Sequence, residues 1–404
     1  MNMKWLEQWF EKIEPKGRWS WLGSTYEAFH TFAFTPKAVT RTGSHIRDAV
    51  DMKRSIIIVV IALIPALLFG MWNIGYQTYS ADPSNFNFQF SIFNLWWFGF
   101  LRMLPLIAVS YIVGLGIEFA FAQYRGHEVN EGFLATGLLI PMIVPVTTPL
   151  WQMALAVAFA VVIGKEVFGG SGMNFLNPAL VARAFLFFAY PTHMSGDKVW
   201  VAADLWGSDA IAGATPMGVL SSGADISIFN SQFSILDMLI GTIPGSTCET
   251  SVIAIALGAI LLLFTGIASW RIMLSVFLGG GLMGLLFNAI GGTTYLDLPF
   301  YYHFLMGGFA FGAVFMATDP VTAAQTNTGK WIYGLLIGAF AVLLRVANPA
   351  YPEGMMLSIL LMNCLAPLID HCVISRNIKR RTKRAYVGTG RALSAEDRKE
   401  AHNG

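Results

Sequence analysis

Long apolar segments with very few charged residues recur along this chain of 404 residues. A helix of about 20 apolar residues is long enough to cross the hydrocarbon core of a bilayer. Eight such segments run from Ser55 to Trp72, Leu104 to Phe121, Trp151 to Val167, Ser251 to Ser269, Ile272 to Ile290, His303 to Ala317, Trp331 to Val346 and Gly354 to Val373. Only 12% of the residues are charged, whereas about a quarter are charged in a soluble domain. The pattern predicts an all-α polytopic membrane protein and excludes a soluble enzyme.

Two further apolar segments, Phe133 to Val146 and Pro178 to Tyr190, are short or contain proline. They raise the expected number of transmembrane helices to about ten, and such segments often belong to broken helices around a buried site. The strings from Asn177 to Ala182 and from Asp319 to Ala324 resemble each other, because each places a polar residue, a proline and small residues at a helix entry. This weak similarity favours two repeated halves.

Most lysine and arginine residues outside the apolar segments lie on one side of the expected bundle, and the other side has almost none apart from Lys198. They precede the first segment, follow the last and recur in alternate loops: Arg41, Arg47, Lys53, Arg54, Arg125, Lys165, Arg271, Lys330, Arg376, Lys379, Arg380, Arg381, Lys383 and Arg384. Because such residues concentrate in cytoplasmic loops, both termini are expected in the cytoplasm. We therefore expect a cytoplasmic N-terminal arm (residues 1–54), a transmembrane bundle (55–374) with a periplasmic loop (191–250), and a basic cytoplasmic tail (375–404).

The N-terminal arm contains apolar residues at helical spacing, among them Trp5, Trp9 and Ile13, with charged residues between them. The spacing predicts an amphipathic helix that lies on the membrane surface or against a partner. An ordinary surface helix explains the same spacing equally well.

Charged residues inside or at the edges of the apolar segments include Arg102, Glu118, Arg183, Arg345 and Asp370. A charge in the middle of a bilayer costs at least about 2.5 kcal/mol, so each is a candidate functional residue. An ion pair within the bundle is the alternative explanation. A carboxylate beside carbonyl oxygens suits an alkali cation, which makes Glu118 and Asp370 the candidate cation ligands.

A glycine-rich run from Gly164 to Pro178 opens a helix on the expected cytoplasmic side. Flexible glycines and the amides of Asn174 and Asn177 can hold a planar heterocycle or an anion there. On spacing alone, however, a helix cap is the more common role for such asparagines.

Other motifs indicate no chemistry of their own. The GxGxxG string from Gly279 to Gly284 lies inside an apolar segment, where close helix packing explains the glycines better than a dinucleotide does. Cys248, Cys364 and Cys372 are scattered, so the chain offers no zinc or iron–sulfur framework. We also expect no nucleic-acid partner.

Six strings resemble one family closely, the NqrB/RnfD family, which comprises the B-type subunits of the Na+-translocating NADH:quinone oxidoreductases and the related D-type subunits of Rnf complexes. They run from His127 to Phe133, Lys165 to Leu180, Arg183 to Pro191, Gly266 to Arg271, Gly307 to Val321 and Arg345 to Met356. The similarity extends over essentially the whole chain. It includes the N-terminal arm, which the Rnf protein is expected to lack or shorten.

The resemblance implies a component of a sodium-pumping translocase in the cell inner membrane, with five other subunits (A, C, D, E and F), ubiquinone, Na+ and lipid as partners. Electrons from NADH are expected to pass through a covalent FMN and a non-covalent riboflavin to ubiquinone, while Na+ moves outward. The family attaches FMN to the threonine of an SGAT motif, which corresponds to Thr215 after Gly213 and Ala214, with Asp209 upstream and Ala212 at the usual serine position.

The resemblance also implies roles for residues elsewhere in the chain. Asn174 and Asn177 correspond to riboflavin contacts, and Gly114 to one glycine of a pair in the quinone region, where Leu115 replaces the other. Glu118 and Asp370 correspond to acidic residues of the sodium pathway.

Two alternatives remain beside this interpretation. An Rnf D-type protein would pass electrons between ferredoxin and NAD, and the N-terminal arm argues against it. A passive channel or solute transporter built from repeated halves would also place polar groups between broken helices, but it would carry no covalent flavin.

Overall fold

The computed structural model of the chain describes residues 26, 40, 42–44, 52–81, 91–126, 132–196, 199–202, 213–348 and 354–388. These residues form helices and turns, and none of them lies in a β-strand. They divide into two compact units, one ending at Ile267 and the other starting at Ala268. The predicted amphipathic helix of the N-terminal arm, Asp209 and the part of the predicted basic tail after Gly388 lie outside the described residues.

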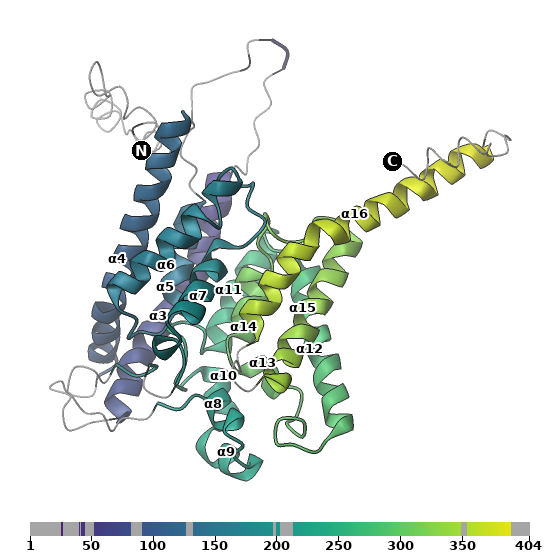
Figure 1. Cartoon of the computed structure of the whole chain (residues 1–404). Helices are drawn as coiled ribbons and strands as arrows, with labels where there is room; N and C mark the ends of the chain where they lie inside the picture. The colour runs from purple at the N-terminus through teal and green to yellow at the C-terminus, as the bar shows by residue number, and fades with distance from the viewer. Residues whose placement is uncertain are drawn as a thin grey trace. The chain divides into compact units, whose positions relative to one another are not determined.

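The described part of the first unit contains two long apolar helices, α3 (Met52–Ala81) and α4 (Ile92–Arg125), four apolar helices of 11 to 13 residues, and several shorter ones (Figure 1). Its other described elements are α5 (Phe133–Ile143), α6 (Leu150–Val162), η2 (Glu166–Phe168), α7 (Pro178–Ala189), η3 (Pro191–His193), α8 (Pro216–Ser221), α9 (Ile226–Gln232), α10 (Ile235–Ile240) and α11 (Val252–Phe264). The helix α4 packs against α3, α5 and α6, and α3 also packs against α11. The packing makes α4 central to this unit.

The second unit contains three long helices and one broken segment. Its elements are α12 (Trp270–Ile290), α13 (Tyr302–Leu305), α14 (Phe309–Phe311), the π-helical η5 (Gly312–Met316), α15 (Asn327–Ala347) and α16 (Met355–Gly388). Glycines line the contact between α12 and α15: Gly279 lies against the backbone of Leu335, and Gly338 against that of Val276. Gly279 of the GxGxxG string therefore packs α12 against α15, as the sequence indicated, whereas Gly281 and Gly284 lie beside Phe300.

Six helices in the described part of the chain are long and apolar enough to cross a membrane. They are Lys53–Ala81, Ile92–Arg125, Leu150–Phe168, Trp270–Ile290, Asn327–Ala347 and Met355–Arg384. The helices α5, α7 and α11 are apolar but shorter, with 11, 12 and 13 residues. The polytopic helical prediction is confirmed at this level, whereas neither about ten crossings nor a repeat of two halves is confirmed.

The segment predicted from His303 to Ala317 is broken. Gly307 and Gly308 have φ angles of 61° and 66°, a backbone conformation that glycine adopts at little cost. These two residues separate α13 from α14 and so interrupt the helix. The predicted polar loop 191–250 also differs from expectation, because it contains η3, α8, α9 and α10. Its short helices begin at capping residues, including Thr215 and Ser234.

Candidate functional site

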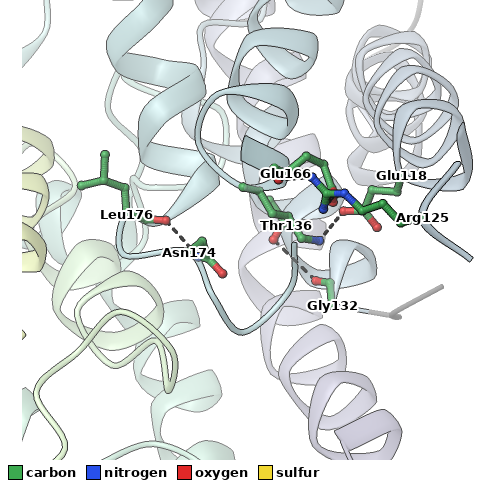
Figure 2. A network of polar contacts seen from close by, with 8 residues as sticks. Glu118, Arg125, Gly132, Thr136, Glu166, Asn174 and Leu176 are labelled. Atoms are coloured by element: carbon green, nitrogen blue, oxygen red, sulfur yellow. Dashed lines mark hydrogen bonds and ion pairs between the residues drawn. The ribbon is translucent and has the colours of Figure 1, made fainter. Parts of the chain in front are cut away.

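A buried ion pair joins Glu118 of α4, which is labelled in Figure 2, to Lys165, the residue that precedes η2. Their side chains are only 4% and 5% exposed, and the ammonium also lies 5.9 Å from the ring centroid of Phe133. Removing one member of a buried pair typically costs about 3–5 kcal/mol, because the other charge is left uncompensated. The structure therefore shows Glu118 in an ion pair within the bundle, the alternative explanation of the sequence analysis, with a lysine as its partner.

The position of Glu118 follows from the buried face of α4. Leu95, Gly99, Met103, Leu106, Ser110, Gly114 and Glu118 recur every three or four residues and form one buried face. Gly114 lies one turn before Glu118 and leaves room for the ring of Phe133, which a Cβ atom at Gly114 would overlap. Gly114, the predicted quinone-region residue, therefore packs against α5 here, and it lies on the same helix face as Glu118.

A second ion pair of opposite polarity lies beside the first. Arg125, at the end of α4, donates from Nη1 to Glu166 Oε2 (3.1 Å) and from Nη2 to the Glu166 carbonyl oxygen (2.7 Å). The consecutive residues Lys165 and Glu166 thus contact two charged residues seven positions apart on α4. The sequence analysis counted Lys165 among the loop charges that indicate the cytoplasmic side, but its side chain is buried and paired with Glu118.

The glycine-rich loop follows directly from this cluster. Gly169, Gly170 and Gly172 have positive φ angles, so the chain folds back between η2 and α7. Asn177 caps α7, since its Oδ1 accepts the Ala179 N–H at 3.0 Å. The Nδ2 of Asn174 donates to the Leu176 carbonyl oxygen at 2.9 Å, and Figure 2 shows its carbonyl oxygen turned away from that bond. Asn177 therefore has the capping role that spacing favoured, and both amides border the loop.

Thr215 occupies the N-cap position of α8. Its Oγ1 accepts the Gly218 N–H at 3.0 Å, and the residue is half-buried, as is Ala214. Gly213 is buried, whereas Asp209 lies outside the described residues. Because the cap uses the Thr215 oxygen only as an acceptor, the local fold is compatible with an esterified hydroxyl.

Asp370 of α16 binds the start of α15. Its carboxylate accepts the N–H groups of Gln325 (2.6 Å) and Thr326 (3.0 Å) and the Thr326 hydroxyl (2.6 Å). The N-terminus of a helix carries a partial positive charge, so an anion is stable there. Asp370 is half-buried and bound to this helix terminus, rather than paired with an arginine.

Sequence reasoning identified Arg183 but missed its partner, Glu249, with which it forms a third ion pair among the described residues of the first unit. Arg183 of α7 donates to Glu249 Oε1 at 2.8 Å and to Ser246 Oγ at 3.1 Å. The segment around Glu249 enters the unit beside α5, where the Cys248 N–H donates to the Met142 carbonyl oxygen at 3.0 Å. Arg183 thus pairs within the bundle, but its partner came from the loop that the sequence assigned to the periplasmic side.

Arg345 of α15 is 1% exposed and binds the break between α13 and α14. Its Nη1 donates to the His303 carbonyl oxygen (2.6 Å), and its Nη2 donates to those of Met306 (2.9 Å) and Gly307 (3.2 Å). Carbonyls at the end of a helix lack intrahelical donors, and this guanidinium supplies them. The position of Arg345 is thereby explained by the fold of the second unit.

These observations define a multi-pass helical membrane protein with paired charges inside its first unit. Residues 39–379 match the model of the NQR2, RnfD, RnfE family, and the chain belongs to this family. It is 50% identical to the B-type subunit of the Na(+)-translocating NADH-quinone reductase of Ectopseudomonas mendocina, over 94% of this chain and 97% of that protein. The B-type subunits of Stutzerimonas stutzeri and Azotobacter vinelandii are 49% and 46% identical, over 94% of this chain and 97% and 98% of their own lengths.

Proposed function

We propose that this chain is the B-type subunit of a Na+-translocating NADH:quinone oxidoreductase, passing electrons through two flavins to ubiquinone while Na+ moves outward. The main support for this proposal is the 50% identity to such a B-type protein over 94% of the chain. In this proposal the protein lies in the cell inner membrane, has both termini in the cytoplasm and assembles with five other subunits (A, C, D, E and F).

The cofactor assignments rest on the chemistry of the residues present. Thr215 would carry FMN through a phosphoester bond, since its hydroxyl oxygen lies on a half-buried helix cap. Asn174 and Asn177 would bind riboflavin through their amides at the edge of the glycine-rich loop. Flavins bound there would supply one- and two-electron transfer, while the chain holds and orients them.

Three further residues complete the proposal. Gly114 would border the quinone region, and Glu118 and Asp370 would take part in sodium passage. A carboxylate inside an apolar bundle requires a counter-cation or hydrogen-bond donors, and both carboxylates have them. Sodium would therefore have to compete with the partners that each carboxylate already has.

An Rnf D-type protein is the second candidate, because the family includes RnfD proteins. The alignment with the B-type relatives covers 94% of this chain, which is a larger share than residues 39–404 make up. The alignment therefore enters the N-terminal arm, and this favours the B type.

A purified complex containing this chain tests the function as a whole. We expect NADH-driven quinone reduction that Na+ stimulates, together with ultraviolet fluorescence of the denatured chain on a gel. A channel or solute transporter would give neither signal. Activity with ferredoxin and NAD instead of quinone would identify the Rnf type.

Riboflavin binding is tested without disturbing the cap of α7. The double variant Asn174→Ala/Asn177→Ser removes both amides and retains a hydroxyl acceptor at the cap position. Two hydrogen bonds of about 0.5–1.5 kcal/mol each correspond to roughly 5- to 150-fold weaker binding, so riboflavin should be lost on purification while covalent FMN remains. Extractable riboflavin is measured by chromatography.

The control for this variant is Ser251→Ala, which removes the side-chain cap of α11, a helix of similar length. It should retain riboflavin. Full riboflavin in the double variant would reject these two asparagines as its ligands.

Orientation is tested by labelling single cysteines in intact cells with an impermeant maleimide. The native Cys248 is unsuitable, because the residue is buried and because burial and the neighbouring Glu249 raise the pKa of its thiol. With all three native cysteines replaced, Ser222→Cys in the exposed turn after α8 should react, and Ser44→Cys should not. The reverse pattern would invert the proposed topology.

A further inference from the structure

Lys165 is the cation that neutralises Glu118 in this structure. Both side chains are at least nine-tenths buried, and the pair lies where α4, the start of α5 and the end of α6 meet. A buried carboxylate is stable only with a cation, a proton or several donors. The carboxylate therefore already holds one monovalent cation, which is covalently tethered to the chain.

The cluster formed by this pair and the neighbouring pair of Arg125 and Glu166 is electrically balanced. Among the described residues it contains two acids, Glu118 and Glu166, and two bases, Lys165 and Arg125, each base paired with one acid. An additional Na+ would give the buried cluster a net positive charge, which is costly in a low-dielectric interior. A monovalent cation can therefore bind Glu118 favourably only by replacing another one.

The position of Lys165 allows such a replacement. The residue lies between α6 and η2, with φ −133° and ψ −62°, outside regular helical geometry. Its ammonium sits on a flexible four-carbon stem, so that it can leave Glu118 without a movement of α4. The other acid of the same cluster, Glu166, is the next residue in the chain.

We propose that Lys165 is a tethered cation that occupies the Glu118 carboxylate when Na+ is absent and is displaced when Na+ binds there. One monovalent cation replaces another at the carboxylate, and the cluster stays electrically balanced because the displaced ammonium swings out of it toward solvent on its flexible stem. The inference rests on the proposed function and assigns a positioning role to Lys165, which the resemblance does not address.

The test uses the purified complex, with both flavins quantified, and a Na+ series for quinone reduction. Lys165→Met removes the competing ammonium and keeps an apolar stem of similar length. The Na+ concentration for half-maximal rate should fall about threefold or more, and the maximal rate should fall too, because no ammonium helps to release Na+. Lys165→Arg retains the charge and should stay closer to the wild type, whereas Glu118→Gln should require more Na+.

A second measurement does not depend on turnover. In the thermal unfolding of the Lys165→Met complex, NaCl should stabilise more than choline chloride does, and by a larger margin than in the wild type, because Na+ supplies the missing counter-charge. The matched control is Glu249→Gln, which breaks the buried pair with Arg183 in the same unit but outside this cluster, and it should change neither the half-maximal Na+ concentration nor the Na+-specific stabilisation.

The outcomes separate the two proposals. If Lys165→Met and Glu249→Gln both lower assembly and neither changes the Na+ response, the Lys165–Glu118 pair is a structural ion pair and the tethered-cation inference is wrong. If the wild-type complex itself reduces quinone without any response to Na+, the proposed function fails instead.

Discussion

Replacing Thr215 by asparagine should abolish covalent FMN on this chain while leaving α8 intact. Asparagine is among the best N-cap residues, so its side-chain oxygen can accept the Gly218 N–H that Thr215 now accepts. It has no hydroxyl, and a phosphoester cannot form. The expected loss is complete, since it removes the bonding atom and not merely an interaction.

The measurement is the intact mass of the isolated chain, supported by in-gel fluorescence after denaturation. Thr215→Ser is the matched control, because it keeps both the hydroxyl and the capping oxygen, and it should retain FMN at least in part. Thr215→Val would lose the cap as well, at about 1 kcal/mol, and is the less informative variant. A flavin-sized mass increment that persists in Thr215→Asn would place the attachment site elsewhere.

Replacing Arg345 by methionine should prevent the second unit from folding stably. The change removes the donors for the carbonyl oxygens of His303, Met306 and Gly307. A buried polar group left without a partner costs about 1–3 kcal/mol, so the total reaches several kcal/mol, a large fraction of the stability of a typical domain. We expect little assembled complex, measured by size-exclusion chromatography and by thermal unfolding in detergent.

The control for Arg345 is Arg271→Met in α12 of the same unit. Arg271 is half-buried, and its guanidinium lies 5.2 Å from the Trp270 ring centroid. Its loss should cost about 1 kcal/mol or less. Equal yields of the two variants would contradict the structural role assigned to Arg345.

Apolar length predicted the long helices well, because a span in lipid must satisfy its backbone within one helix. Apolar length failed as a predictor where glycines with positive φ angles interrupt a helix within an apolar segment. The segment predicted to end at Ser269 ends its helix at Phe264, shortly before Gly266, whose φ angle is 72°. The pair Gly307–Gly308 likewise breaks a run that composition alone treats as continuous. The cap of α8 was also visible in the sequence, as a threonine followed by proline.

The candidate charges were predictable, but their partners were not. The cost of burial identified Glu118, Arg183 and Arg345 from the sequence. Their partners lie 47, 66 and up to 42 residues away, at distances that only the fold determines. A pair between α4 and the chain after α6 depends on how these helices pack, which periodicity on one helix does not specify. The cofactor residues stay predictions.

The two ion pairs at the end of α4 also fix the register of the loop that follows α6. Glu118 and Arg125 are separated by about two helical turns and so share one face of α4, while their partners Lys165 and Glu166 are adjacent and opposite in sign. If the loop reversed along α4, Lys165 would face Arg125 and Glu166 would face Glu118, two repulsive contacts in place of two attractive ones. The order of these charges therefore permits only one alignment of the loop along α4. That alignment sets where the glycine-rich turn with its two asparagines begins.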